Sequence, residues 1–274
     1  MDIGIAALSE VRRPDCGEIM AGGDTYDWSG CSDGYHAQGV AVAVSNKMTP
    51  MIIGVTLVIE RIMSLLVTPW VSFTWSRHAP TEASDHTMRD TFYATLESVV
   101  DQCPRQDTLP GLGDFIASTA TDRDDYETCV GPHGSGAANQ NSTKFLDFAR
   151  SHRLRVAGSW FQHPHAHCWT WYSNAGGVAK EIDHVLVDGR WRMIQNCRVY
   201  RSAQFLNTDH WLVVATLTLH LKSRRMVTLH LKSRRMVPSQ PRLDVGKLKD
   251  ERVAEEFANR LSGHLGGSGC FGRS

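Results

Sequence analysis

The alternation of apolar and polar stretches along the chain predicts two β-rich halves. Short apolar runs rich in Val, Ile, Thr and aromatic residues, bounded by Gly or charged residues, are typical of strands. Gly-rich polar stretches at residues 22–30 and 31–39 follow the first of these runs, and we expect loops there. The expected strands are residues 2–11, 40–44, 52–58, 62–67, 73–75 and 109–118 in the first half, and 169–173, 181–187, 197–201 and 211–219 in the second.

Two segments carry a helical period instead. Residues 87–103 repeat apolar side chains at the helical spacing, and residues 143–154 place Phe145, Phe148 and Leu154 on one face. Helices set between strands in two β-rich halves favour an α/β fold in which paired, mainly antiparallel sheets are flanked by helices. A parallel doubly wound sheet fits this order less well.

The last expected strand begins directly after two charged or titratable residues. Residues 207–219 read NTDHWLVVATLTL, so Asp209 and His210 stand in front of an unbroken apolar run. Such a run is typical of a strand that is covered on both faces. The two polar residues at its start are therefore either a strand cap or part of a site.

Composition limits the partners and the compartment. The chain of 274 residues has 29 basic and 29 acidic side chains, so a polyanionic partner must be bound by a local patch. Residues 210–243 contain no acidic residue and form such a basic stretch. Seven cysteines without a C-x-x-C pair or a signal peptide indicate reduced thiols, which predicts a nuclear or cytoplasmic protein. The most apolar stretch, residues 51–67, is too short and too charged to span a membrane.

The C-terminal part contains a repeat. The segment TLHLKSRRMV occurs at residues 218–227 and again at 228–237, which indicates a recent duplication because solenoid units are longer. A short amphipathic helix is expected after Asp250. We therefore expect an enzyme-like domain over residues 1–219 and a basic, linker-like tail over residues 220–274.

Acidic residues close or adjoin four of the expected strands: Glu10, Asp114, Asp183 and Asp209. Any one of them alone is most simply a capping or solvated carboxylate. Together with ALSEVRRP, YDWSG, HAPTE, LGDFIA, VGPHGSG, WTWYS, KEIDHVLV and TDHWLVVATL, they resemble the endonuclease/exonuclease/phosphatase family. The likeness is greatest to endonuclease domains of RTE-type (LINE-class) retrotransposons and to the craniofacial development protein 2-like proteins derived from them, and it covers residues 2–219.

The resemblance implies a four-layer α/β sandwich that hydrolyses DNA phosphodiesters with Mg²⁺, or with Mn²⁺ in its place. It implies that Glu10 is the principal metal ligand, with Asp209 also near the ion, and hard cations do prefer carboxylate oxygens. Asp114 would deprotonate the attacking water, and Asp183 would order substrate, metal or water. Asp209 would orient His210, which would donate to the phosphate.

The same resemblance suggests substrate contacts. Thr170 and Asn174 would lie near the DNA groove, although the tryptophans on either side of Thr170 are expected to be core residues. Arg192 could bind phosphates, with solvated surface as the alternative. His163, His165, His167 and Cys168 in HPHAHC could hold zinc, but their spacing lacks the paired pattern of structural zinc sites.

The sequence departs from the family at three places. Ile116 stands where the family has Asn after GDF, so a hydrogen-bond donor is lost, which typically lowers the rate by about 10² to 10³. His78 stands where the family has Tyr. A first strand is expected to be missing, which would leave a sheet edge open, and Pro110 is expected inside a central strand. We expect impaired activity. The alternatives are an inactive relative that binds nucleic acid or protein, and a phosphatase for small molecules.

Overall fold

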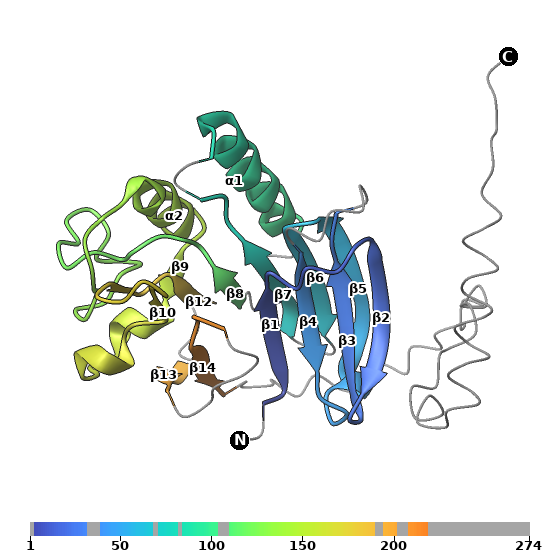
Figure 1. Cartoon of the computed structure of the whole chain (residues 1–274). Helices are drawn as coiled ribbons and strands as arrows, with labels where there is room; N and C mark the ends of the chain where they lie inside the picture. Colours follow the sequence, from blue (N-terminus) through green and yellow to red (C-terminus); the bar gives the residue numbers. More distant parts are fainter. Residues whose placement is uncertain are drawn as a thin grey trace, which may run out of the picture. The chain divides into compact units, whose positions relative to one another are not determined.

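The computed structural model describes residues 3–31, 39–67, 71–81, 84–103, 110–189, 194–201 and 208–218. These residues form a mixed α/β fold with several antiparallel sheets and two α-helices (Figure 1). The chain divides into the units Met1–Lys222 and Ser223–Ser274, and every described residue lies in the first unit. Arg192, the tandem repeat beyond Thr218 and the expected tail helix lie outside the described residues.

The first sheet has four antiparallel strands. Its order is β1 (Ile5–Ser9), β4 (Val40–Val44), β3 (Asp24–Ser29) and β2 (Cys16–Ala21), so β1 and β2 are edge strands. The expectation of a loop over residues 22–30 is wrong, because most of this segment is β3. Gly22 and Gly23 close the β2–β3 hairpin with φ angles of 64° and 94°. A two-residue hairpin turn needs such positive φ angles, and glycine adopts them without steric cost.

The second sheet has six strands and includes one parallel pair. Its order is β5 (Ile52–Ile59), β6 (Ile62–Val67), β7 (Val71–His78), β8 (Gly111–Asp114), β12 (Asp183–Asp188) and β9 (Leu154–Val156). Strands β7 and β8 are parallel because the helix α1 (His86–Asp101) connects them as a crossover. Pro110 lies just before β8, so the expectation that it interrupts a central strand is wrong.

Both helices bury one face against the second sheet. Phe92, Leu96 and Val99 of α1 share a core cluster with Phe145 and Phe148 of α2 (Gln140–Ser151) and with residues of β6, β9 and β12. Helix α2 begins three residues before the expected segment because Asn139 caps it. The Asn139 side chain accepts a hydrogen bond from the Ser142 amide, and the Ser142 hydroxyl accepts one from the Asn139 amide.

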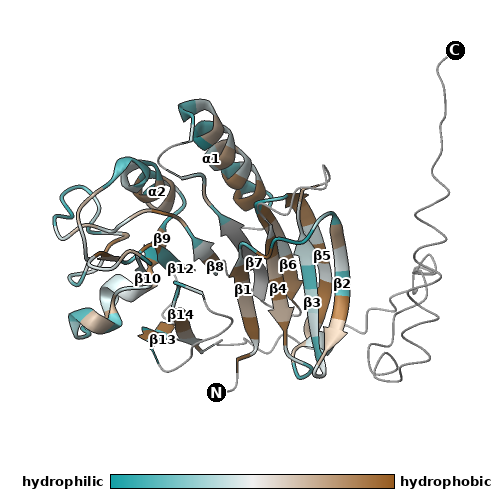
Figure 2. Cartoon of the chain, in the orientation of Figure 1, coloured by the Kyte–Doolittle hydropathy of each residue, from teal (hydrophilic) through white to brown (hydrophobic). Residues whose placement is uncertain are grey.

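The two large sheets face each other. Val40, Val42 and Val44 of β4 pack against Met63 and Leu65 of β6, so the hydrophobic residues of these strands fill the space between the sheets (Figure 2). The order of layers is therefore sheet, sheet, helices. Within the described residues both α-helices cover the second sheet, so three of the four expected layers are present and the first sheet carries no helix on its outer face.

Two small sheets complete the fold. Strands β10 (Trp171–Tyr172) and β11 (Ala179–Lys180) form one hairpin, and β13 (Ile194–Tyr200) pairs with β14 (Leu212–Leu217) to form the other. Residues of β14 are half-buried or exposed, so the expectation of a strand covered on both faces is wrong. Val213, Ala215 and Leu217 pack on a small cluster around Val185 and Cys197.

Short elements connect these strands. The 3₁₀ helices are η1 (Thr49–Met51), η2 (Ala157–Trp160) and η3 (His165–His167). The six cysteines among the described residues are free thiols. No helix among the described residues has the length and apolar character that crossing a membrane requires.

Candidate active site

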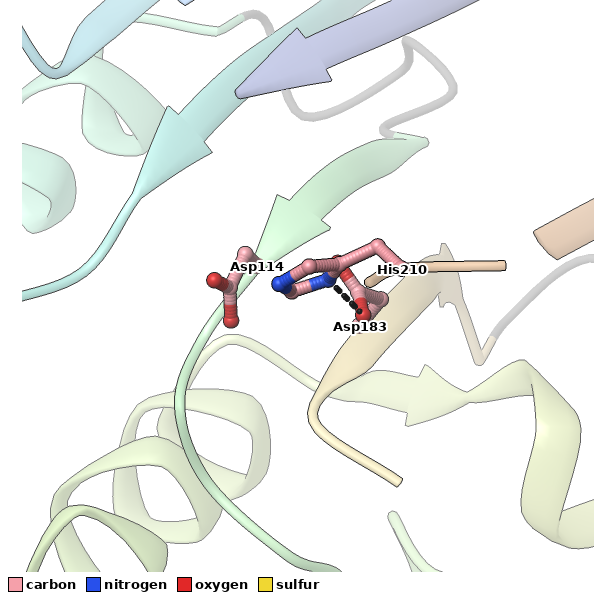
Figure 3. A group of neighbouring side chains, drawn as sticks. All are labelled: Asp114, Asp183 and His210. Atoms are coloured by element: carbon pink, nitrogen blue, oxygen red, sulfur yellow. Dashed lines mark hydrogen bonds and ion pairs between the residues drawn. The ribbon is translucent and has the colours of Figure 1, made fainter. Parts of the chain in front are cut away.

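The second sheet brings two acidic residues together at its centre. Asp114 ends β8 and Asp183 begins β12, and the two are direct partners in the antiparallel register. His210 precedes β14 and forms a bridge with Trp171, which places its imidazole beside them. Ligand atoms of Asp114, Asp183 and His210 all lie within 4.8 Å of one another (Figure 3). Three residues distant in the sequence therefore form one cluster.

His210 is paired with Asp183. Its Nδ1 lies 2.8 Å from Asp183 Oδ2, and its other nitrogen is turned towards Asp114 (Figure 3). Burial by itself lowers the pKa of His210, but the Asp183 hydrogen bond and the charges of Asp183, Asp114 and Asp209 outweigh it and raise the pKa to about 9. His210 is therefore an imidazolium at neutral pH, and its second nitrogen is a donor.

The expected hydrogen bond between Asp209 and His210 is not formed. Asp209 instead accepts a hydrogen bond from Trp171 Nε1 at 2.8 Å through Oδ2. The reason is local, because Asp209 and His210 are neighbours in an extended segment and their side chains leave it in different directions. Asp209 is also outside the group whose ligand atoms converge, although its charge acts on His210.

Asp114 is the most buried of the three, with a side chain 3% exposed. Its Oδ1 accepts a hydrogen bond from the Ile116 amide at 2.9 Å, and its Oδ2 lies 3.3 Å from His78 Nδ1. Burial, followed by the charge of Asp183, raises the pKa of the Asp114 carboxyl, while His78 and His210 oppose this rise. A buried carboxylate next to a second one is a position where positive charge is stabilising.

Glu10 directly follows β1 of the first sheet, and His78 lies between it and Asp114. His78, at the end of β7, lies with Nε2 3.8 Å from Glu10 Oε1 and with Nδ1 towards Asp114. Glu10 itself is 47% exposed, accepts a hydrogen bond from Arg12 at 3.0 Å, and has a φ of 52°. The predicted metal ligands Glu10 and Asp209 are thus not members of the converging group.

Ile116 has an unusual backbone conformation. Its φ is 48°, in the left-handed region that is unfavourable for β-branched residues and that asparagine tolerates far better. The conformation is held by two hydrogen bonds, one from the Ile116 amide to Asp114 and one from Asn139 Nδ2 to the Ile116 carbonyl. The backbone conformation at position 116 therefore suits asparagine better than the isoleucine that is present.

Of the predicted substrate contacts, Thr170 is buried and Asn174 is exposed. Thr170 is 1% exposed, and its Oγ1 accepts hydrogen bonds from the Ile182 and Asp183 amides at 3.0 Å. It therefore fixes the start of β12 and is not accessible to a substrate, contrary to expectation. Asn174 is exposed in the turn between β10 and β11, so its contact with DNA stays a prediction. Trp171 is half-buried and holds Asp209, which the expectation of a core residue did not include.

The histidine-rich segment has a structural role. His163 Nε2 lies 2.9 Å from the Cys197 carbonyl and His167 Nδ1 lies 3.4 Å from the Val199 carbonyl, so both rings attach η3 to β13. In the described part of the chain, this segment contributes no member to a group of converging metal-binding atoms. This arrangement gives no support to the zinc alternative.

Other positioning residues carried weak signals in the sequence. Asn139 links α2 to the Ile116 carbonyl, and the capping pattern of Asn139 with Ser142 could have located this helix start. His184 Nε2 lies 2.7 Å from the Ala117 carbonyl and thereby supports the loop after Asp114. No sequence pattern distinguishes His184, which directly follows Asp183, from an ordinary core residue.

The donor set suits a divalent cation. Two carboxylates with closely spaced oxygens, one of them buried, are the ligands that Mg²⁺ and Mn²⁺ prefer, whereas a protonated His210 has no lone pair left for a metal. The raised pKa of the Asp114 carboxyl indicates an uncompensated negative charge that such an ion would offset. A separate cavity of about 370 Å³ lies beside Trp169, Lys180 and Asn139, and neither the two aspartates nor His210 line it.

Comparison with known proteins identifies solved structures of similar fold. No family profile matches the chain. The 3′ phosphatase NExo from Neisseria, bound to a product DNA hairpin, matches with a TM-score of 0.55 and 19% identity over 72% of this chain and 80% of that chain. An AP endonuclease from Archaeoglobus fulgidus matches with a TM-score of 0.54 and 13% identity over the same shares. The chain therefore has the endonuclease/exonuclease/phosphatase fold.

A curated relative gives a more particular likeness. Craniofacial development protein 2 from Tragulus javanicus is 27% identical over 224 residues, which are 81% of this chain and 38% of that protein. The chain is thus a distant homologue of craniofacial development protein 2, and it spans less than half of the length of that relative.

Proposed function

We propose that the unit Met1–Lys222 is a phosphodiesterase that cuts DNA with Mg²⁺ or Mn²⁺. The observation that carries the proposal is the convergence of Asp114, Asp183 and His210, with His210 held as an imidazolium by Asp183. Two carboxylates and a cationic donor are the groups that phosphodiester hydrolysis requires, because charge builds on the phosphate oxygens in the transition state. The DNA in the structure of the Neisseria relative agrees with this substrate class.

The chain's own residues take distinct parts in the reaction. The second nitrogen of His210 donates to a phosphate oxygen, and Asp183 keeps the ring in place. Asp114, whose Oδ2 lies 3.3 Å from His78 Nδ1, accepts the proton of the attacking water. As the water oxygen bonds to phosphorus, the phosphorus–oxygen bond opposite it breaks, and the leaving oxygen takes up a proton from solvent. Asp114, Asp183 and Glu10 would hold the cation, which would supply positive charge that polarises the phosphate and offsets the charge of the buried Asp114.

The second candidate is a relative without nuclease activity that binds nucleic acid or protein. Ile116 favours it, because an apolar side chain in the left-handed conformation replaces a donor beside Asp114. We also propose a retrotransposon origin and a nuclear or cytoplasmic location, both from the sequence pattern.

A plasmid-nicking assay tests the proposal. The full chain is incubated with supercoiled plasmid and Mn²⁺ or Mg²⁺, and open circles are measured with and without a chelator. We expect cation-dependent nicking that His210→Ala abolishes and that His86→Ala, a change at an exposed histidine of α1, leaves intact. Nicking that survives His210→Ala would refute the mechanism.

Absence of nicking separates the two candidates further. If Ile116→Asn restores cleavage to an inactive chain, the active site is intact apart from that position. If cleavage stays absent while the chain still binds DNA in the chelator, the second candidate is correct.

A further inference from the structure

A cluster of aromatic rings is formed by residues near in the chain to His210 and to its bridge partner Trp171. The Tyr172 ring meets the Trp169 ring at 6.2 Å and the Trp211 ring at 6.1 Å, both nearly perpendicular, with interplanar angles of 81° and 83°. Such edge-to-face contacts stabilise the mutual orientation of the rings. The three rings therefore form a fixed support.

Arg201 is held on this support. Its guanidinium carbon lies 5.5 Å from the Tyr172 ring centroid and 5.6 Å from the Trp211 ring centroid, and the residue is exposed at the end of β13. Contact with two aromatic faces orders the side chain and leaves the N–H groups at the edge of the guanidinium plane pointing away from the rings. Among the residues that the structure describes, Arg201 forms no ion pair with a carboxylate.

Backbone hydrogen bonds join the segment that carries Tyr172 to the segment that carries His210. The Tyr172 amide donates to the Asp209 carbonyl at 3.0 Å, and the Trp211 amide donates to the Thr170 carbonyl at 2.7 Å. Trp211 directly follows His210 in the chain. Tyr200, which precedes Arg201, pairs with Leu212 in the β13–β14 register, so the segments that carry Arg201 and His210 are neighbours in the fold.

A second arginine has the same arrangement. Arg198, three residues earlier on β13, lies with its guanidinium 4.4 Å from the Tyr200 ring centroid and donates from Nη2 to the Tyr200 hydroxyl at 2.6 Å. Both arginines are exposed and both are ordered by aromatic rings. Their charges are thus presented to solvent along one strand.

We propose that Arg201 binds a backbone phosphate of the DNA strand that enters the active site, with Arg198 beside it as a weaker contact. The inference rests on the proposed function for the identity of its partner, a nucleic acid. An ordered guanidinium offers two parallel donors to a phosphate and loses little conformational entropy on binding. Such a contact positions the strand in register with His210 and carries no sequence preference.

The test measures DNA binding in a chelator, where cleavage does not occur. Fluorescence anisotropy with a labelled duplex gives the affinity of the full chain at several salt concentrations. Arg201→Ala should weaken binding about tenfold and reduce the slope of log affinity against log salt by about one, equally for unrelated sequences. Arg201→Lys should keep the slope but recover only part of the affinity, because an ammonium cannot form the paired contact.

Arg150 provides the matched control. Its guanidinium lies 5.0 Å from the Tyr126 ring centroid, but it belongs to α2 and pairs with Asp147 at 2.9 Å. Arg150→Ala should leave affinity and slope unchanged. Equal binding by the native chain and Arg201→Ala, or an equal loss in Arg150→Ala, would overturn the inference, as would displacement by an acidic peptide at lower concentration than by DNA.

The outcomes are separable from those of the nicking assay. If the native chain binds DNA and Arg201→Ala weakens it, the inference holds even where no nicking occurs. If the chain nicks plasmid but Arg201→Ala binds as well as the native chain, the proposed function stands and the phosphate contact falls.

Discussion

At the scale of single residues, Ile116 combines a backbone strain with a missing donor. A β-branched residue at a φ of 48° costs about 1 to 3 kcal/mol. We expect Ile116→Asn to raise the free energy of unfolding by about 1 kcal/mol, which for a domain of this size raises the melting temperature by about 2 to 4 °C. It should also raise the nicking rate, because the amide can donate beside Asp114.

Ile116→Gly separates the two effects. Glycine relieves the strain without supplying a donor. It should raise the melting temperature, measured by differential scanning calorimetry, but not the nicking rate. If glycine and asparagine raise the rate equally, the side-chain donor has no part in catalysis.

The pair of Asp183 and His210 makes a prediction about pH. The pKa of His210 is raised from 6.5 to about 9, so its contribution to stability is complete below pH 6.5 and is lost as the pH rises through 9. This contribution amounts to about 3 kcal/mol. Asp183→Asn should bring the pKa of His210 well below 9, measured by NMR titration of the imidazole in a chelator.

Urea unfolding checks the sign of this effect. The native chain should lose stability between pH 6.5 and 9, and Asp183→Asn should lose much less over the same range. Identical pH dependence of the two proteins would show that Asp183 does not hold the imidazolium.

At the scale of elements, the apolar pattern of a segment predicted its secondary structure correctly where the burial of its apolar side chains determines that structure. The period of residues 87–103 predicted α1, and the apolar runs around Glu60 and Arg61 predicted two strands, which pair as the β5–β6 hairpin. The pattern failed for β3, whose polar residues lie in a sheet because its neighbours and a Gly-Gly turn fix it. It also failed for β14, whose residues are half-buried or exposed.

The start of α2 joins an element to the site. Asn139 caps the helix with its side-chain oxygen and bonds the Ile116 carbonyl with its side-chain nitrogen. Asn139→Ala should lower the free energy of unfolding by about 1 to 2 kcal/mol, because cap and link are both lost. Urea unfolding measures this change.

Asn139→Ser is the informative companion. Serine keeps the cap, but its single short hydroxyl cannot accept from the Ser142 amide and also reach the Ile116 carbonyl as the Asn139 amide group does. We expect it to retain most of the stability while nicking slows, since the loop after Asp114 is less well held. A rate equal to that of the native chain would show that the link is only structural.

At the scale of the whole molecule, the resemblance to the endonuclease family indicated a set of site residues but not how they pair. It implied that Glu10, Asp114, Asp183, Asp209 and His210 share one site, and of these Asp114, Asp183 and His210 converge. The partner of His210 depends on the directions of neighbouring side chains in short extended segments, which no periodicity encodes. The same holds for Thr170, which the sequence suggested as a substrate contact and which supports β12.

The fold places Asp114 and Asp183 side by side on the paired strands β8 and β12 of the six-stranded sheet. The two neighbouring carboxylates lower the stability of the folded chain. Because burial and Asp183 raise the pKa of the Asp114 carboxyl, ionising Asp114 above its ordinary pKa of 3.8 costs folding free energy. Asp114→Asn removes this charge. In a chelator at pH 7 it should melt at a higher temperature than the native chain, although it cannot cleave DNA.

A divalent cation should reverse that order. Mn²⁺ bound between Asp114 and Asp183 offsets both charges and stabilises the folded state according to its concentration relative to its dissociation constant. We therefore expect millimolar Mn²⁺ to raise the melting temperature of the native chain in differential scanning fluorimetry and to leave Asp114→Asn nearly unchanged. An equal shift in both proteins would place the ion elsewhere. A shift confined to the native chain would mean that the charge which destabilises the metal-free sheet is the charge that binds the ion.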